Sequence, residues 1–174
     1  FNKMATKLIA LFGPNGYVGQ QFSSYLHSRG YVYHSINRKM CDCSDKDKVY
    51  ETLLTVKPDF VINCAGYTGK PNVDACEENK EATYKGNVDI PMNLGQACRD
   101  LSIPWGHVSS GCIYNGYEKD FTEDDKPNFS FDNPPCSHYS GTKAEAELKM
   151  LEEFEECYIW RLRIPFNEYP NNRN

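Results

Sequence analysis

Three side chains in the second half of the sequence have the types and the spacing that carbonyl chemistry needs. Tyr139 and Lys143 are four residues apart, so they share one face if this segment is helical. A nearby ammonium favours the ionised form of tyrosine, whose ordinary pKa is about 10, and brings that pKa toward neutrality. Tyr139 can then protonate a ketone oxygen, and Ser110 can hydrogen-bond the same oxygen. We therefore predict ketone reduction, with Tyr139 as proton donor, Lys143 lowering its pKa and Ser110 orienting the carbonyl.

A glycine-rich segment near the N-terminus predicts an anion-binding turn. Gly13, Gly16 and Gly19 follow the apolar residues 8–12 at intervals of three. Gly13 permits a sharp turn, Gly16 lets a pyrophosphate approach the backbone, and Gly19 lets the next helix pack closely. The start of that helix presents N–H groups and the positive end of its dipole. We expect this strand–turn–helix to bind a dinucleotide; the competing interpretation is a glycine-rich turn without a ligand.

The end of the second predicted strand bears on the choice of dinucleotide. Sites for NAD usually place an acidic residue there to hold the ribose 2′-hydroxyl. Here the chain reads Asn37-Arg38-Lys39, and two cations suit a 2′-phosphate. We predict NADP(H), with NAD(H) as a possible substitute and ordinary surface charge as the alternative explanation.

The elements that must position these residues alternate along the chain. Strand patterns cover residues 8–12, 31–37, 60–64, 103–109 and 158–164. Helical patterns follow the glycine turn and cover residues 45–56, 77–101 in two pieces, and 137–156. This alternation predicts an α/β fold, a Rossmann-like doubly wound parallel sheet with ligands at the carboxyl ends of its strands. Residues 117–135 form a polar loop, and loops of that length are usually functional.

Composition excludes several classes of function. The 174 residues carry a net charge of -5, which argues against nucleic acid or an anionic membrane as partners. No apolar run approaches the roughly 20 residues of a membrane span, and no signal-peptide pattern is present. The eight cysteines contain no Cys-x-x-Cys pair, so we expect no metal, and their use fits the reducing cytoplasm. His107 is expected to be structural.

Taken together, these motifs resemble the extended short-chain dehydrogenase/reductase family. The shared features are the glycine motif, the strand end at residues 63–66 (Asn-Cys-Ala-Gly), Ser110 and the pair Tyr139/Lys143. Residues 68–74, 110–114 and 123–129 make the sequence similar to the bifunctional nucleotide-rhamnose synthases (epimerase-reductases) and to the dTDP-4-dehydrorhamnose reductases. The similarity runs from about Thr6 to the last residue.

The resemblance implies an activity and a substrate class. It implies NADPH-dependent reduction, with 3,5-epimerisation, of a UDP- or dTDP-linked 4-keto-6-deoxy sugar on the route to L-rhamnose. Reduction without epimerisation is the first alternative. A non-catalytic NADP-binding subunit, like the regulatory subunit of methionine adenosyltransferase, or a fragment is the second. The intact Ser110, Tyr139 and Lys143 favour an enzyme. A homodimer is possible through the two long helices.

The candidate site combines the residue patterns with the resemblance. Cofactor contacts are expected from the glycine turn, two strand ends and the catalytic pair: Gly13, Asn15, Gly16, Tyr17, Val18, Gly19, Asn37, Arg38, Lys39, Asp42, Cys43, Cys64, Ala65, Gly66, Tyr139 and Lys143. Lys143 is also expected to hold the ribose. The resemblance implies that Asp42 lies against the adenine and that Asn87 supports the active site. Substrate contacts are expected from Thr68, Asn72, Ser110 and Cys112.

Cys112 is the fourth candidate catalytic residue, beside Ser110, Tyr139 and Lys143. Inverting C3 and C5 of a 4-keto sugar needs an acid/base group near the ring, in addition to the tyrosine. Cys112 follows Ser110 by two residues, and a neighbouring cation can shift a thiol toward neutrality from its ordinary pKa of about 8.5. The alternative is a buried apolar cysteine.

The ends of the chain carry two further expectations. Family members continue into a smaller lobe that holds the sugar nucleotide, and the lysine that follows their equivalent of Arg173 and Asn174 is absent here. We expect residues 5–174 to form an NADP-binding domain with its substrate lobe missing or truncated. Residues 1–3 are expected to be foreign to the natural protein, with Met4 as its start.

Overall fold

Five strands form one parallel sheet in the order β2-β1-β3-β4-β5. A computed structural model describes residues 7–117 and 119–166. The strands, each within two residues of its predicted start, are β1 (Leu8–Phe12), β2 (Val32–Ile36), β3 (Phe60–Asn63), β4 (Trp105–Ser110) and β5 (Cys157–Leu162). The predicted Rossmann-like class is confirmed. The order reverses between β1 and β3, which is where such sheets bind their ligands.

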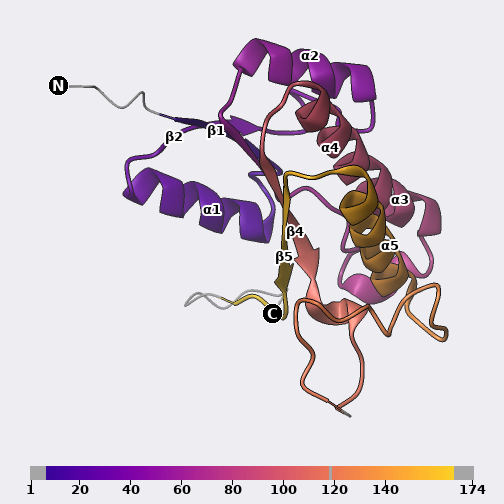
Figure 1. Ribbon diagram of the computed structural model, residues 1–174. Helices are drawn as coiled ribbons and strands as arrows, with labels where there is room; N and C mark the ends of the chain where they lie inside the picture. Colours follow the sequence, from indigo (N-terminus) through magenta and orange to yellow (C-terminus); the bar gives the residue numbers. More distant parts are fainter. Residues whose placement is uncertain (1–6, 118, 167–174) are drawn as a thin grey trace.

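Helices cover both faces of the sheet (Figure 1). Helix α1 (Tyr17–Ser28) lies on one face, and α2 (Lys46–Val56), α4 (Ile90–Asp100) and α5 (His138–Glu153) lie on the other. The main core lies between the sheet and these last three helices, and includes Phe12, Val61, Leu94, Trp105 and Met150. A smaller cluster of Leu11, Leu26 and Ile62 lies under α1. No helix among the described residues is long and apolar enough to cross a membrane.

The predicted pair of helical pieces in residues 77–101 is one helical run with a widened turn. After the 3-10 turn η1 (Val73–Cys76), α3 (Lys80–Tyr84) continues through the π-helical segment η2 (Lys85–Asp89) into α4. Extra residues of this kind in a helix occur often at functional sites. Here the segment carries Asn87, which is fully buried.

Helix α5 positions both members of the catalytic pair. Its N-cap is Ser137, whose side chain accepts a hydrogen bond from the backbone N–H of Ser140 at 3.1 Å. Helix α5 ends at Glu153, three residues before its predicted end. The following Phe154 is extended and packs edge-on against Trp105, with ring centroids 5.8 Å apart. Burying the Phe154 ring against Trp105 therefore stabilises an extended backbone here more than a further turn of α5 would.

The loop between the short η3 (Gly111–Ile113) and α5 lies at the carboxyl end of the sheet (Figure 1). Its first part is held by stacking of Tyr114 on Phe121, with centroids 4.8 Å apart, and by a 2.6 Å hydrogen bond from the Tyr114 hydroxyl to the Asp125 carbonyl. The expected foreign residues 1–3, Met4, and the tail with Arg173 and Asn174 lie outside the described residues.

Candidate active site

One cleft of about 610 Å³ collects most of the predicted site residues. It runs along the carboxyl ends of β1, β3 and β4 and is bordered by α5. The predicted residues that line it are Gly16, Tyr17, Val18, Cys64, Ala65, Gly66, Thr68, Asn72, Ser110, Cys112, Tyr139 and Lys143. The tertiary fold therefore brings together the glycine turn and the proposed catalytic groups, which are more than 90 residues apart in sequence.

The glycine turn closes the cleft at the end of β1. Gly13 has φ +74, and a Cβ there would lie 2.6 Å from the backbone nitrogen of Ala65. A Cβ at Gly19 would lie 2.0 Å from the carbonyl oxygen of Gly13. At Gly16, which lines the cleft, the nearest atom to an added Cβ is 3.5 Å away. Gly13 and Gly19 are therefore required by the fold of the turn, whereas Gly16 keeps open space beside the cleft.

The start of α1 suits an anion. Gly16 is its N-cap and gives no side-chain cap, and no acidic residue lies in the first turn. The helix itself therefore places no negative charge at its positive end. Asn15 is exposed, and its carbonyl accepts a hydrogen bond from Gln20 at 3.0 Å, which supports the turn from outside.

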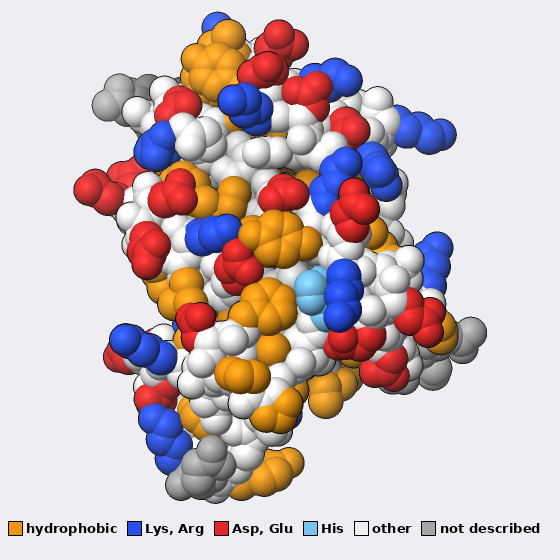
Figure 2. All heavy atoms as spheres, turned by 90° about the vertical axis from the view of Figure 1, so that its right-hand side faces the viewer, with side chains coloured by type: hydrophobic (Ala, Val, Ile, Leu, Met, Phe, Trp, Pro, Cys, Tyr) orange, Lys and Arg blue, Asp and Glu red, His pale blue; other side chains and the backbone are white. Residues whose placement is uncertain are grey.

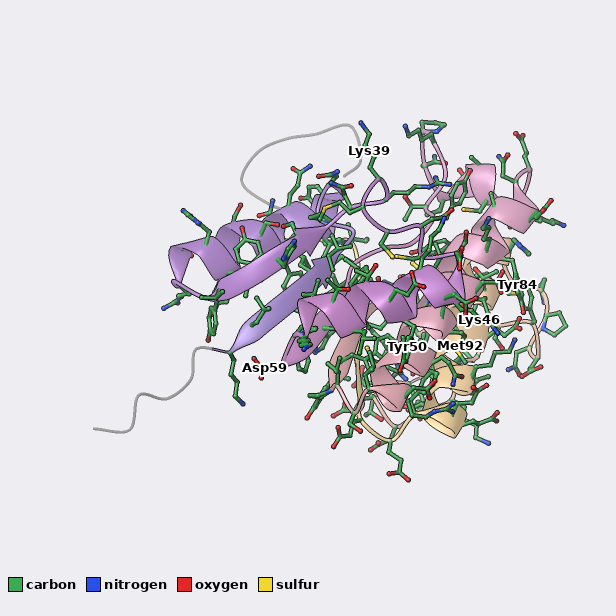
Figure 3. All side chains as sticks on the ribbon, turned by 90° about the horizontal axis from the view of Figure 1, so that it is seen from above. Lys39, Lys46, Tyr50, Asp59, Tyr84 and Met92 are labelled. Carbon is green, nitrogen blue, oxygen red and sulfur yellow. The ribbon has the colours of Figure 1, made fainter. Side chains whose placement is uncertain are left out.

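The residues after β2 lie beyond the cleft lining. The Asn37 side chain accepts hydrogen bonds from the backbone N–H groups of Lys39 at 2.9 Å and Met40 at 3.2 Å. This turn leaves Arg38 and Lys39 exposed, and Figure 3 shows Lys39 extending outward from it. Two cations therefore border the end of β2 without a carboxylate hydrogen-bonded to either of them among the described residues.

Asp42 and Cys43 lie farther along this segment. A hydrogen bond from the Ser44 hydroxyl is the main cause that lowers the pKa of Asp42. The Cys43 side chain belongs to the main core, and burial raises the pKa of its thiol to about 12. A contact between Cys43 and a cofactor would thus use backbone atoms, because its side chain faces away from the cleft.

Tyr139 and Ser110 meet at the other end of the cleft. Tyr139 is 8% exposed and Ser110 is 6% exposed. Burial raises the pKa of Tyr139, and a hydrogen bond with the Ser110 side chain acts in the opposite direction. The Ser110 oxygen also accepts the backbone N–H of Cys112 at 3.2 Å, which holds it at the end of β4. The structure thus joins a phenol and a serine hydroxyl at one wall of the cleft.

Lys143 lines the cleft with Tyr139 and Ser110. Its ammonium donates to the carbonyl of Val108 at 3.4 Å, and it is not among the groups that shift the pKa of Tyr139. Burial lowers the pKa of Lys143 to about 8, against a raising effect of the negative charge of Glu147. The lowering of the Tyr139 pKa by Lys143 stays a prediction.

Asn87 links the loop after β3 to α5. Its Oδ1 accepts the Tyr67 N–H at 2.8 Å, and its Nδ2 donates to the Tyr67 carbonyl at 3.0 Å and to Thr142 Oγ1 at 3.3 Å. It therefore holds the loop that carries Gly66 and Thr68 against the helix of the catalytic pair. Its supporting role in catalysis stays a prediction.

Residues 6–173 match the family model of the RmlD substrate binding domain. The chain belongs to this family. The predicted resemblance to the dTDP-4-dehydrorhamnose reductases and the epimerase-reductases is confirmed. The bifunctional dTDP-4-dehydrorhamnose 3,5-epimerase/dTDP-4-dehydrorhamnose reductase of Arabidopsis thaliana is 31% identical over 172 residues, which cover 94% of this chain and 54% of that protein.

Two solved structures are similar to this RmlD-family chain. The UDP-rhamnose synthase of Acanthamoeba polyphaga mimivirus is 27% identical with a TM-score of 0.86, covering 96% of this chain and 59% of that one. The dTDP-4-dehydrorhamnose reductase of Bacillus anthracis, solved in complex with NADP, is 24% identical with a TM-score of 0.78, covering 96% and 57%. The similarity to the Bacillus anthracis structure is a similarity of fold alone. The chain spans a little more than half the length of each of these relatives.

Several polar residues at the site were not predicted from the sequence. Ser109 lines the cleft beside Ser110. Behind it the buried Glu147 forms an ion pair with the half-buried Arg161, whose Nε lies 2.9 Å from Glu147 Oε2. Glu147 could have been found, because it continues the four-residue spacing of Tyr139 and Lys143. Arg161 had no such signal, since its partner lies on another element.

His107 is buried in β4 behind the cleft. Its Nδ1 lies 3.0 Å from Asn63 Nδ2, and burial holds its pKa well below the ordinary range. Asn63 Oδ1 accepts the Ala65 N–H at 2.9 Å, so the amide nitrogen faces the imidazole as a donor. A neutral His107 thus helps to fix the loop that carries Ala65, in line with the expected structural role.

Proposed function

We propose that this chain is the NADP-binding and catalytic part of a sugar-nucleotide reductase that also epimerises its substrate. The substrate is a nucleoside-diphosphate-linked 4-keto-6-deoxy sugar, and the route leads to L-rhamnose nucleotides. The observation that carries this proposal is that Ser110 and Tyr139 line one cleft that begins at the Gly16 turn, close enough for the Ser110 hydroxyl to act on the pKa of Tyr139. The named functions of the Arabidopsis and mimivirus relatives support the substrate class.

The residues of the cleft fit NADP(H). The Gly16 turn is open toward the cleft, the start of α1 carries no acidic residue, and Arg38 and Lys39 lie at the end of β2. The turn and α1 would hold the pyrophosphate, and the two cations would hold the 2′-phosphate. We assign residues 5–174 to one NADP-binding domain on this basis.

Ketone reduction adds a hydride to the carbonyl carbon and a proton to its oxygen. The bound NADPH supplies the hydride. The Tyr139 hydroxyl donates its proton to the carbonyl oxygen, while Ser110 donates a hydrogen bond that stabilises the developing charge. Burial of both side chains strengthens these interactions, because water is largely excluded around them. Thr68 and Asn72, exposed at the mouth of the cleft, would contact the sugar.

Cys112 is the proposed acid/base group of the epimerisation. It lines the cleft half-buried, and its negative form would lie close enough to Tyr139 to raise the pKa of that hydroxyl. It could remove the protons next to the ketone, at C3 and C5, from a position beside the group that polarises the carbonyl. The same cleft without this step would perform reduction alone.

Solvent deuterium exchange in the full-length protein tests this assignment. Cys112→Ala is expected to abolish deuterium incorporation at C3 and C5 and to retain reduction of a pre-epimerised 4-keto sugar. Cys136→Ala is the matched control, since that half-buried cysteine lies outside the lining of the cleft. Deuterium exchange at the wild-type rate in Cys112→Ala would favour the reductase-only alternative.

Three finer assignments complete the proposal. One relative is named for a dTDP-linked sugar and another for UDP-rhamnose, so the substrate of this chain is proposed as the diphosphate-linked sugar that both share. The eight free thiols support the cytoplasm as the compartment. A homodimer would pair the face of α4 and α5, where apolar side chains lie among charges of both signs (Figure 2).

Beside that face, Lys46 and Tyr50 of α2 and Met92 of α4 lie side by side and line a hollow of about 360 Å³ (Figure 3). Burial of the exposed Tyr50 ring in a second copy would favour association. Sedimentation velocity over a range of concentrations tests the dimer, and a monomer throughout would exclude it.

A further inference from the structure

A buried carboxylate lies directly behind the proposed catalytic residues. Glu147 is 1% exposed and continues the face of α5 that carries Tyr139 and Lys143, one turn beyond the lysine. Its Oε1 accepts a hydrogen bond from the Ser109 hydroxyl, and its Oε2 accepts one from Arg161 Nε at 2.9 Å. Burial of a carboxylate is costly unless it is paired and hydrogen-bonded, and both oxygens here have partners.

The partners of Glu147 belong to two other elements. Ser109 precedes Ser110 in β4, and Arg161 lies in β5. Arg161 Nη1 donates to the Glu123 carbonyl at 2.9 Å. The guanidinium also lies over the ring of Tyr114, 5.5 Å from its centroid. Through these contacts one carboxylate connects α5, the ends of β4 and β5, and the loop that follows η3.

We propose that Glu147 is a positioning residue for the reduction: it holds the end of β4 against α5 so that Ser110 and Tyr139 stay in contact, and its charge maintains the ammonium of Lys143. This inference rests on the proposed function. Glu147 itself faces away from the cleft, since it does not belong to the cleft lining, so it acts through Ser109 and Lys143.

The electrostatic part of the role follows from what surrounds Lys143. Burial lowers the pKa of Lys143 to about 8, and the negative charge of Glu147 is the larger of two effects that raise it; the Cys64 thiol is the other. Burial raises the pKa of Cys64 to about 12, so this thiol is neutral at pH 7. From β4, His107 is neutral and the Val108 carbonyl accepts from the ammonium. Glu147 is therefore the charged group that favours protonated Lys143.

A substitution that removes the charge of Glu147 but keeps its shape distinguishes this role from simple packing. Glu147→Gln retains the size and an acceptor oxygen but removes the charge. Glu145→Gln is the matched control on the same helix. Glu145 pairs with Lys149 at 2.8 Å and accepts from the Tyr84 hydroxyl at 2.6 Å, on the surface where Figure 3 labels Tyr84. Its change removes a helix carboxylate without touching β4 or Lys143.

The first measurement is an NMR titration of the Lys143 side chain in ¹³C-labelled lysine samples, assigned with Lys143→Met. The wild-type midpoint is expected near the value of about 8 set by burial. In Glu147→Gln it should fall by about one pH unit or more, because an opposite charge at close range is worth that much. Glu145→Gln should leave it in place. An unmoved midpoint in folded Glu147→Gln would overturn the proposal.

The second measurement is the pH profile of kcat/KM in the full-length protein. Activity that needs the ammonium falls as the pH rises through the Lys143 pKa, so this fall should move to lower pH in Glu147→Gln. The kcat at neutral pH should also drop, by up to about 100-fold if Ser110 is displaced. Both effects should be smaller in Glu147→Asp, which restores the charge, and a purely structural ion pair would move neither the profile nor the titration.

If Glu147→Gln does not fold, Glu147→Asp carries the test: its shorter side chain should still lower the Lys143 midpoint, and an unchanged midpoint would contradict the proposal. Failure of the proposed function would appear as wild-type protein that binds no NADPH and reduces no keto sugar. The lysine titration is independent of that result.

Discussion

The two ends of the cleft are built from different parts of the chain. At the end of β1 the cleft is lined by residues 16–18. Their turn is packed so closely that a Cβ at Gly13 would collide with the backbone of Ala65, and one at Gly19 with the carbonyl of Gly13. At the end of β4 the walls are side chains from different elements: Ser110 from β4, and Tyr139 and Lys143 from α5. The first end depends on space, and the second depends on buried charge and hydrogen bonds.

This difference predicts different sensitivities. The glycine end should respond to size and be indifferent to charge changes nearby, because its donors are peptide groups. The catalytic end should tolerate small changes in side-chain shape and respond to changes of charge. The reason is that burial lowers the pKa of Lys143 and raises that of Tyr139. Three substitutions test the contrast.

The largest effect is expected at the catalytic end. Tyr139→Phe removes one hydroxyl without changing the packing of the ring, so NADPH binding should remain nearly intact. Reduction should fall by roughly 10²–10⁴-fold, the range for loss of acid catalysis. Steady-state kinetics of the full-length protein together with fluorescence titration of NADPH measure the two effects. Reduction at the wild-type rate would remove Tyr139 from the mechanism.

The glycine end should show a loss of stability instead. Gly19→Ala places its Cβ 2.0 Å from the Gly13 carbonyl oxygen. The backbone must shift, at a cost of about 3 kcal/mol in the free energy of unfolding. Urea unfolding measures this cost, and NADPH affinity should fall with it.

Gly16→Ala is the matched control for Gly19→Ala. Its Cβ meets nothing nearer than 3.5 Å, so stability should change by less than about 1 kcal/mol. NADPH binding should nevertheless weaken, because the methyl group would occupy space beside the pyrophosphate. Unchanged NADPH affinity in Gly16→Ala would mean that no phosphate approaches this turn.

The smallest effect concerns the exposed cations after β2, which belong to neither end. NADPH should bind more tightly than NADH by roughly 1.5–3 kcal/mol if Arg38 and Lys39 contact a 2′-phosphate. Arg38→Ala should remove most of that preference without changing stability, since Arg38 is exposed. Titration of both cofactors against both proteins measures it. Equal affinities in the wild type would contradict the predicted NADP(H) preference.

Much of the fold was predictable because the spacing of apolar and turn residues along the chain indicates where strands and helices form. Apolar runs of strand length and turn residues located all five strands of the described sheet, and Ser137 and Asp45 act as N-caps where helices α5 and α2 were expected to begin. The π-helical segment η2 was not predictable, because nothing in the order of residues 85–89 marks the extra residue in the turn. The early end of α5 depends on Trp105, which is distant in sequence.

By itself, the sequence determined the glycine turn and the spacing of Tyr139 and Lys143, because both lie within one turn or one helix. Only the tertiary structure decided where the Lys143 ammonium points and what its pKa is. Those properties depend on Val108 in β4, on Cys64 just after β3, and on the carboxylate of Glu147, which Ser109 and Arg161 hold in place. Burial and charge act through space. The spacing of residues along the chain therefore does not indicate which groups, distant in sequence, will surround a side chain.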